Sequence, residues 1–131
     1  SADYIQSNDI KSHTIVELHP QILPKLYEWS KDKPNVRIIE GDWFERIEEI
    51  CSMEYDGIFF DTHMDPHAYD FRRLVVDRCL KSGGVFTWFS PRNINIYGYD
   101  SYKSFAIDVN PVNCSYYDSS QAICPYYINS K

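Results

Sequence analysis

Glycine is scarce in this chain. Its 131 residues include five glycines, and no two of them form a Gly-x-Gly pair. A nucleotide-binding loop of the doubly wound kind needs closely spaced glycines, because its backbone must approach the cofactor. The sequence also lacks a P-loop and the Gly-x-Ser-x-Gly elbow of a serine hydrolase. The last two absences argue against a P-loop nucleotide-binding enzyme and against a serine hydrolase.

Cysteine is also sparse. The four cysteines, Cys51, Cys79, Cys114 and Cys124, form no Cys-x-x-C pair, and their spacings fit no zinc module. We therefore expect free, mostly buried thiols in a reducing compartment.

Positive charge and long apolar runs are lacking as well. The formal net charge is -6 and the sequence pI is about 5.1, whereas a general nucleic-acid binder usually presents a basic face. No apolar run approaches the length of a membrane span, and no signal peptide is recognisable. These features predict a cytoplasmic protein with neither a nucleic-acid nor a membrane partner.

The residues that are present predict an α/β fold in a single domain over residues 1–131. Apolar patterns predict strands at 13–18, 36–40, 55–60 and 85–90, and helices at 1–8, 21–31, 43–52 and 68–80. Such alternation is typical of βαβ units with a parallel sheet. Two further strands, at 102–109 and 116–128, are joined only by turns and must pair antiparallel.

The stretch Tyr55–His63 is where we first look for chemistry. Ile58–Phe60 is apolar without alternation, which indicates a strand buried on both faces. The strand ends abruptly at Asp61, Thr62 and His63. Ligands of open α/β sheets bind just beyond the carboxyl ends of the strands, so these three residues are candidates for a functional site.

Two other strand ends carry candidate ligand-binding groups. Glu17 ends a predicted strand, where an acidic residue commonly accepts hydrogen bonds from ribose hydroxyls; it could equally cap the helix that follows. Gly41, Asp42 and Trp43 follow the next strand and could bracket a nucleobase. Alternatively, Asp42 caps a helix and Trp43 packs in the core, and both interpretations can hold together.

A metal site is the alternative for the third strand end. Asp61, His63, Asp65 and His67 alternate, and histidine with carboxylate suits Zn²⁺, Mn²⁺ or Fe²⁺. Such a site would indicate a metal-dependent hydrolase. Pro66 interrupts the alternation, and we expect no bound metal.

Several segments together resemble a known family. They are similar to successive motifs of class I S-adenosylmethionine-dependent methyltransferases and comprise His13–Pro20, Asn35–Trp43, Tyr55–Thr62 and Leu80–Phe86. Within that superfamily the chain most resembles the branch of guanidinoacetate methyltransferase and the arginine δ-N-methyltransferases. Tyr55–Thr62 and Asn113–Tyr117 carry that narrower likeness. The resemblance implies a Rossmann-like three-layer sandwich whose parallel strands end in an antiparallel hairpin.

The resemblance also implies site residues. S-adenosylmethionine would be bound by Glu17 at its ribose and by Gly41, Asp42 and Trp43 at its adenine. Asp61 would be the catalytic residue, because a carboxylate pairs with a guanidinium group and can orient its nitrogen. Thr62 and His63 would be neighbours of the substrate, which would be a small guanidino compound or an arginine-containing protein.

The amino-terminal end of the chain departs from the family pattern. Ser1–Asn8 matches the helix that follows the family's first strand and glycine-rich loop, so we expect a fragment lacking both. Residues 1–131 alone would then bind S-adenosylmethionine weakly or not at all. The absent strand would lie between the strands that end in Glu17 and Asp61, exposing their edges. We therefore expect a homodimer through these edges, or alternatively a non-catalytic oligomerisation or protein-binding module on the same fold.

Overall fold

The described part of the chain folds as two compact units. A computed structural model describes residues 2–62, 64–89, 97–108 and 121–131. Unit 1 is Ser1–Ser52 and unit 2 is Met53–Lys131, and one methyltransferase-like domain over 1–131 stays a prediction. No helix within the described ranges is long and apolar enough to cross a membrane.

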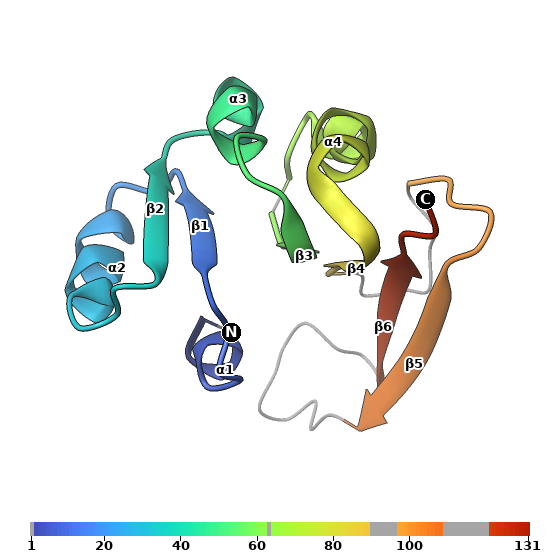
Figure 1. Ribbon diagram of the computed structural model, residues 1–131, viewed down its shortest axis with the longest axis horizontal. Helices are drawn as coiled ribbons and strands as arrows, with labels where there is room; N and C mark the ends of the chain where they lie inside the picture. The colour runs from blue at the N-terminus through green and yellow to red at the C-terminus, as the bar shows by residue number, and fades with distance from the viewer. Residues whose placement is uncertain (1, 63, 90–96, 109–120) are drawn as a thin grey trace. The chain divides into compact units, whose positions relative to one another are not determined.

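Unit 1 is built on two parallel strands, β1 (His13–Glu17) and β2 (Val36–Glu40). Helix α2 (Leu23–Ser30) connects them and lies beside β2 in Figure 1. The register pairs the first residues of the two strands with each other, and likewise their last residues, Glu17 and Glu40. This confirms the predicted βαβ order and brings two strand ends together.

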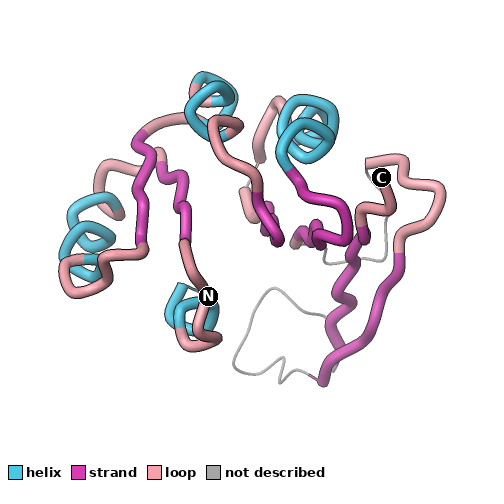
Figure 2. The backbone as a smooth tube through the Cα atoms, viewed as in Figure 1, coloured by secondary structure: helices cyan, strands magenta, loops and turns pink. Residues whose placement is uncertain are grey.

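Short helices complete unit 1, and Figure 2 colours helices cyan. They are α1 (Ala2–Gln6), the 3₁₀ helix η1 (Trp43–Glu45) and α3 (Ile47–Ile50). The single helix predicted over 43–52 is therefore wrong, because η1 and α3 are separated at Arg46, whose φ of -115° and ψ of 16° are not helical.

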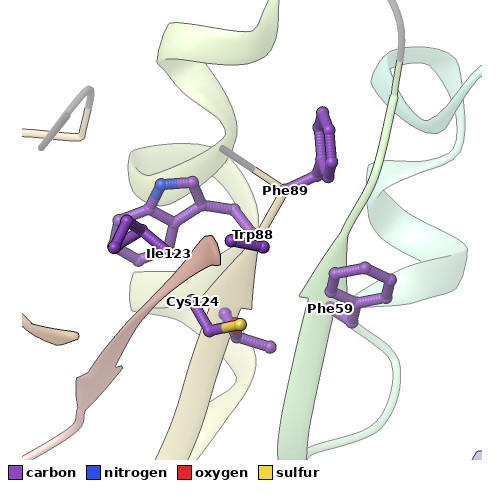
Figure 3. Close-up of a pocket in the computed structure, with 7 residues that line it drawn as sticks. Phe59, Trp88, Phe89, Ile123 and Cys124 are labelled. Carbon is purple, nitrogen blue, oxygen red and sulfur yellow. The ribbon is translucent and has the colours of Figure 1, made fainter. Parts of the chain in front are cut away.

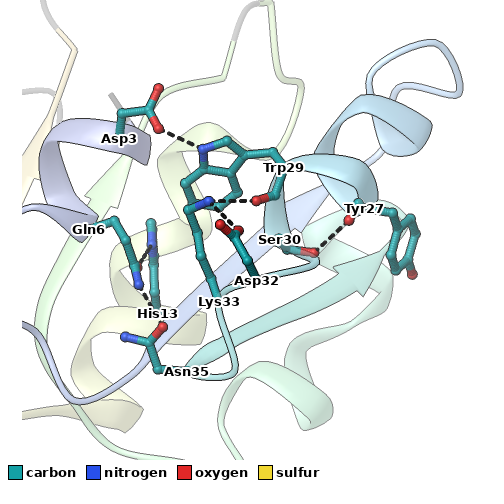
Figure 4. Close-up of polar contacts among 9 residues, drawn as sticks. All are labelled: Asp3, Gln6, His13, Tyr27, Trp29, Ser30, Asp32, Lys33 and Asn35. Atoms are coloured by element: carbon teal, nitrogen blue, oxygen red, sulfur yellow. Dashed lines mark hydrogen bonds and ion pairs between the residues drawn. The ribbon is translucent and has the colours of Figure 1, made fainter.

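Side-chain hydrogen bonds fasten α1 to the rest of unit 1 (Figure 4). Trp29 on α2 donates from its indole Nε1 to Asp3 on α1 over 2.6 Å. Gln6 donates from Nε2 to the Asn35 side chain over 2.6 Å, just before β2. His13 opens β1 and lies 3.3 Å from the Gln6 amide oxygen, and burial lowers the pKa of its imidazole. These contacts hold the amino ends of β1 and β2, opposite the ends that carry Glu17 and Glu40.

Unit 2 contains one four-stranded sheet in the order β3-β4-β6-β5. Its strands are β3 (Tyr55–Phe60), β4 (Leu80–Trp88), β5 (Lys103–Asp108) and β6 (Gln121–Ile128). β3 and β4 are parallel, while β6 is antiparallel to both β4 and β5. The predicted parallel sheet ending in an antiparallel hairpin is thus confirmed, although residues 109 and 116–120 of the predicted hairpin lie outside the described residues.

Aromatic side chains form the core of unit 2. Phe86 on β4 is fully buried, and Trp88 two positions later is 2% exposed. Phe60 at the end of β3 packs on Phe71, with ring centroids 4.1 Å apart. Because Phe60 is anchored in this way, the backbone that leads directly into Asp61 is fixed.

The segment between β3 and β4 is less regular than the helix predicted over 68–80. It consists of a 3₁₀ turn η2 (Ala68–Asp70), a π-helical turn η3 (Arg72–Val76) and α4 (Asp77–Cys79). Strand β4 begins at Leu80, and the strand start predicted at residue 85 is wrong. Leu80 pairs with Tyr55 of β3, which brings this first part of β4 into the sheet. Buried Asn129 also bonds to it: its side-chain amide donates to the Leu80 carbonyl over 2.9 Å, and its backbone N–H donates to the Gly84 carbonyl over 2.9 Å.

Strands β1 and β3 each have a single neighbouring strand within the described ranges. Each therefore presents one sheet edge, as the sequence predicts for the two strands that flank a missing one. The homodimer through these edges stays a prediction.

Candidate active site

The carboxyl ends of β1 and β2 carry the candidate residues of unit 1. The Gly41 N–H donates to the Glu17 carbonyl over 2.9 Å, which extends the pairing of the two strands by one residue. Glu17 is half-buried, and its Oε1 accepts from the His19 N–H over 2.8 Å. Its Oε2 has no hydrogen-bond partner among the described residues. One carboxylate oxygen at this strand end can therefore accept from a ligand hydroxyl.

Glu40, which lies opposite Glu17, is already engaged. Its Oε1 accepts from the Tyr27 hydroxyl over 2.6 Å, and this hydrogen bond raises the pKa of the exposed Tyr27 phenol. Sequence reasoning missed this pair because thirteen positions separate the two residues on different elements. Glu17 and Glu40 therefore each have one carboxylate oxygen bonded within unit 1 and one oxygen without a hydrogen bond among the described residues.

The turn Gly41–Trp43 connects β2 to η1. Gly41 has a φ of +124°, a conformation that L side chains rarely adopt. Asp42 Oδ1 accepts from the Phe44 N–H over 2.9 Å, so Asp42 caps η1. Trp43 is 6% exposed. The capping and packing interpretations of these two residues are therefore confirmed, and their adenine contacts stay a prediction.

Unit 2 carries its own candidate residues. Asp61 and Thr62 follow β3 immediately and are both exposed. The Phe89 N–H donates to the Phe60 carbonyl over 3.2 Å, so pairing with the β4 side continues up to the residue before Asp61. Neither Asp61 nor Thr62 has a hydrogen bond or ion pair to another described residue. His63, the third predicted residue, lies outside the described part of the chain.

An apolar recess lies at the same end of this sheet. Its volume is about 150 Å³, and it is lined by Phe59, Thr87, Trp88, Phe89, Ala122, Ile123 and Cys124. Figure 3 shows these side chains at the carboxyl ends of β3 and β4 and on β6. None of the seven lining residues is charged, so the recess suits an apolar group rather than an anion.

The described residues do not assemble a metal site. No group of three or more His, Cys, Asp or Glu side chains among them could hold a metal ion. Asp65, one of the alternating residues, instead accepts the His67 N–H through Oδ1 over 2.8 Å. Asp65 and His67 thus form a local turn, and His63 of the same set lies outside the described residues.

Comparison with known proteins decides between families. The profile of the guanidinoacetate N-methyltransferase family matches residues 1–105. The chain belongs to this family. Membership makes it a class I S-adenosylmethionine-dependent methyltransferase by descent, and the narrower resemblance seen in the sequence is confirmed.

Relatives named protein arginine N-methyltransferase 2 are similar to this family member. The Kluyveromyces lactis protein is 37% identical over 95 residues, which cover 67% of this chain and 23% of that protein. The Candida glabrata protein is 33% identical over 124 residues, covering 86% of this chain and 30% of that protein. The chain therefore spans about a quarter of the length of these relatives.

Solved structures agree on the fold of this family member. A methyltransferase candidate from Thermoplasma acidophilum matches 99% of the chain with a TM-score of 0.65 and 18% identity, covering 63% of that structure. The Methanococcus jannaschii fibrillarin pre-rRNA processing protein matches 90% of the chain with a TM-score of 0.62 and 18% identity, covering 56% of that structure. The predicted Rossmann-like α/β fold of the methyltransferase type is thereby confirmed.

The family implies a cofactor of the S-adenosylmethionine type, and unit 1 fits part of it. Glu17 offers a carboxylate oxygen that suits a ribose hydroxyl. At Gly41, a Cβ atom would lie 3.0 Å from Arg46 Nε, so the turn has no room for a larger residue without a shift. A small, backbone-exposing turn beside a partly free carboxylate is compatible with a nucleoside ligand.

Proposed function

We propose that the protein transfers a methyl group to the guanidino group of an arginine side chain. The observation that carries the proposal is Asp61, an exposed carboxylate without a partner among the described residues, at the end of β3 in a chain of this family. S-adenosylmethionine, when bound, supplies the methyl group. The proposal assigns the cofactor to residues of unit 1 and the acceptor to residues of unit 2.

Glu17 has the principal role in unit 1. Its free carboxylate oxygen accepts hydrogen bonds from the ribose hydroxyls, while Oε1 stays with the His19 N–H. The Gly41 backbone and the Asp42 carboxylate would contact the edge of the adenine, while buried Trp43 supports this turn from the core. These contacts position the cofactor and take no part in proton transfer.

Asp61 acts on the acceptor. A carboxylate can accept two parallel N–H bonds from a guanidinium group, which fixes the plane of the group and the direction of its nitrogen. Methyl transfer to nitrogen depends mainly on proximity and alignment. When the nitrogen gains the methyl group it must lose a proton, and we assign the Asp61 carboxylate as the base that accepts it. Thr62 is the neighbouring hydroxyl that can contact the same substrate.

An arginine residue of a protein is a better substrate for this site than a small guanidino acid. Guanidinoacetate carries a carboxylate that a binding site would pair with a cation. The recess lined by Phe59 and Phe89 at the end of β3 and β4 has no charged lining residue. The relatives named protein arginine N-methyltransferase 2 support the same choice.

Calorimetric titration with S-adenosylhomocysteine tests the cofactor site in the full-length protein. We expect wild type to bind and Glu17→Gln to bind about tenfold to a hundredfold more weakly, because hydrogen bonds to a charged group contribute about 1.5–3 kcal/mol. Glu28→Gln is the matched control, since Glu28 is an exposed residue of α2 paired with Lys31 over 3.1 Å; its affinity should equal that of wild type. Equal affinity in all three proteins would contradict the role of Glu17.

The non-catalytic module is the second candidate function, favoured by the single-neighbour edges of β1 and β3 within the described ranges. It predicts no binding heat from S-adenosylhomocysteine in any of the three proteins. The same titration therefore separates the two functions.

A further inference from the structure

Arg46 reaches back from the start of α3 to the last residue of β2. Its Nε donates to the Glu40 carbonyl over 2.9 Å. Its own backbone N–H donates to the Trp43 carbonyl over 3.0 Å, and its carbonyl accepts from the Ile50 N–H over 3.0 Å. Both ends of the turn Gly41–Trp43 are thereby attached to one residue.

The Arg46 side chain also packs along Gly41. A Cβ atom at Gly41 would lie 3.0 Å from Arg46 Nε, 3.5 Å from Arg46 Nη2 and 3.6 Å from Arg46 Cγ. The stem and the guanidinium group therefore line one side of the glycine, whose φ of +124° is unusual. On its other side the Gly41 N–H is bonded to the Glu17 carbonyl. Gly41 is held between β1 and Arg46.

The ion pair of Arg46 with Glu49 contributes little to holding the Arg46 side chain in place. Its ion pair with Glu49 is long, at 3.8 Å, and both side chains are about half exposed. Exposed pairs of this kind contribute little to stability. The contacts with Glu40 and Gly41 are therefore the ones with a consequence for the site.

We propose that Arg46 is a positioning residue that fixes the turn Gly41–Trp43 for cofactor binding. This rests on the proposed function, since it assumes that the turn contacts S-adenosylmethionine. Arg46 acts through the Glu40 carbonyl and the Gly41 backbone and does not itself touch the cofactor. Without its Nε donor the turn samples other conformations, and the cofactor must select the competent one, which weakens binding in proportion.

Two substitutions separate the hydrogen bond from the charge. Arg46→Gln places an amide nitrogen at the position of Nε, so it keeps a donor to the Glu40 carbonyl and loses the charge. Arg46→Met places a methyl group there, so it keeps the length of the stem and loses the donor. Arg37→Met is the control, because Arg37 lies on β2 and donates to the Glu49 carbonyl over 2.8 Å, not to the turn.

The test measures affinity for S-adenosylhomocysteine, KM for S-adenosylmethionine, kcat and thermal melting in the full-length protein. We expect Arg46→Met to weaken binding and raise KM about tenfold, which corresponds to loss of one hydrogen bond of about 1.4 kcal/mol. Its kcat should stay within about twofold. Arg46→Gln should recover most of the affinity, and Arg37→Met should bind like wild type.

Four results would overturn the proposal. If Arg46→Met binds like wild type, Arg46 does not position the turn. If Arg46→Met and Arg46→Gln lose affinity only in step with a lower melting temperature, or if Arg37→Met loses as much, the effect is one of general stability. If wild type itself does not bind, the proposed function fails and this inference fails with it.

Discussion

Replacing Asp61 with Asn is expected to lower kcat/KM for arginine methylation by a factor of about 10² to 10³. Loss of one preorganised electrostatic group in an active site has effects of that size. Asn keeps the shape of the side chain but removes the charge that pairs with the guanidinium group and the base that accepts its proton. The fold should persist, because Asp61 is exposed and bonds to no other described residue.

The assay follows labelled methyl groups from S-adenosylmethionine into arginine of a cell extract that lacks the protein. Asp56→Asn is the matched control, since Asp56 is an exposed carboxylate within β3 and has a long ion pair, of 3.5 Å, with Lys81. The control should retain the wild-type rate. Equal rates for Asp61→Asn and wild type would refute a catalytic role for Asp61.

Replacing Phe86 with Ala is expected to lower the free energy of unfolding by about 3–5 kcal/mol, the usual range for a buried Phe→Ala change. Phe86 is fully buried at the centre of unit 2, with its ring centroid 5.1 Å from that of Trp88 and 5.2 Å from that of Tyr97. The substitution leaves a cavity that these large rings cannot close. Since Phe60 belongs to the same cluster, the backbone before Asp61 should loosen as well.

Unfolding in urea, followed by tryptophan fluorescence, measures this change. Phe105→Ala is the matched control, because Phe105 is 55% exposed on β5 of the same sheet. We expect the control to lose less than about 1 kcal/mol. A similar loss in both variants would mean that Phe86 is not at the centre of the core.

Strands with a clear local sequence pattern could be predicted. β1, β2 and β3 are short β-branched or aromatic runs bounded by polar or turn residues, and each begins and ends within one residue of its predicted position. The same local patterns place Glu17 and Asp61 at strand ends. Their chemical roles followed from the family resemblance and still stay predictions.

Features that depend on distant residues could not be predicted. β4 begins five residues early because Leu80 pairs with Tyr55 of β3. Buried Asn129, 49 positions beyond Leu80, adds a side-chain hydrogen bond to the Leu80 carbonyl. Gly83, with a φ of +77°, lies inside this strand and donates its N–H to the Asn129 carbonyl over 2.7 Å.

Hydrogen bonds from side chains to the backbone could not be predicted from the sequence either. Helical periodicity over residues 43–52 gave no sign that Arg46 bonds to the Glu40 carbonyl. That contact accompanies a non-helical backbone at Arg46, which splits the predicted helix into η1 and α3. Periodicity describes which face of an element is apolar, and it carries no information on hydrogen bonds of this kind.

The most direct test of the account is the product formed by the full-length protein. The protein is incubated with labelled S-adenosylmethionine and either a cell extract that lacks it or guanidinoacetate, and the acid hydrolysate is analysed for methylated arginine. The account predicts labelled methylarginine from the extract and no label in guanidinoacetate. No labelled methylarginine from folded protein at saturating S-adenosylmethionine would contradict it.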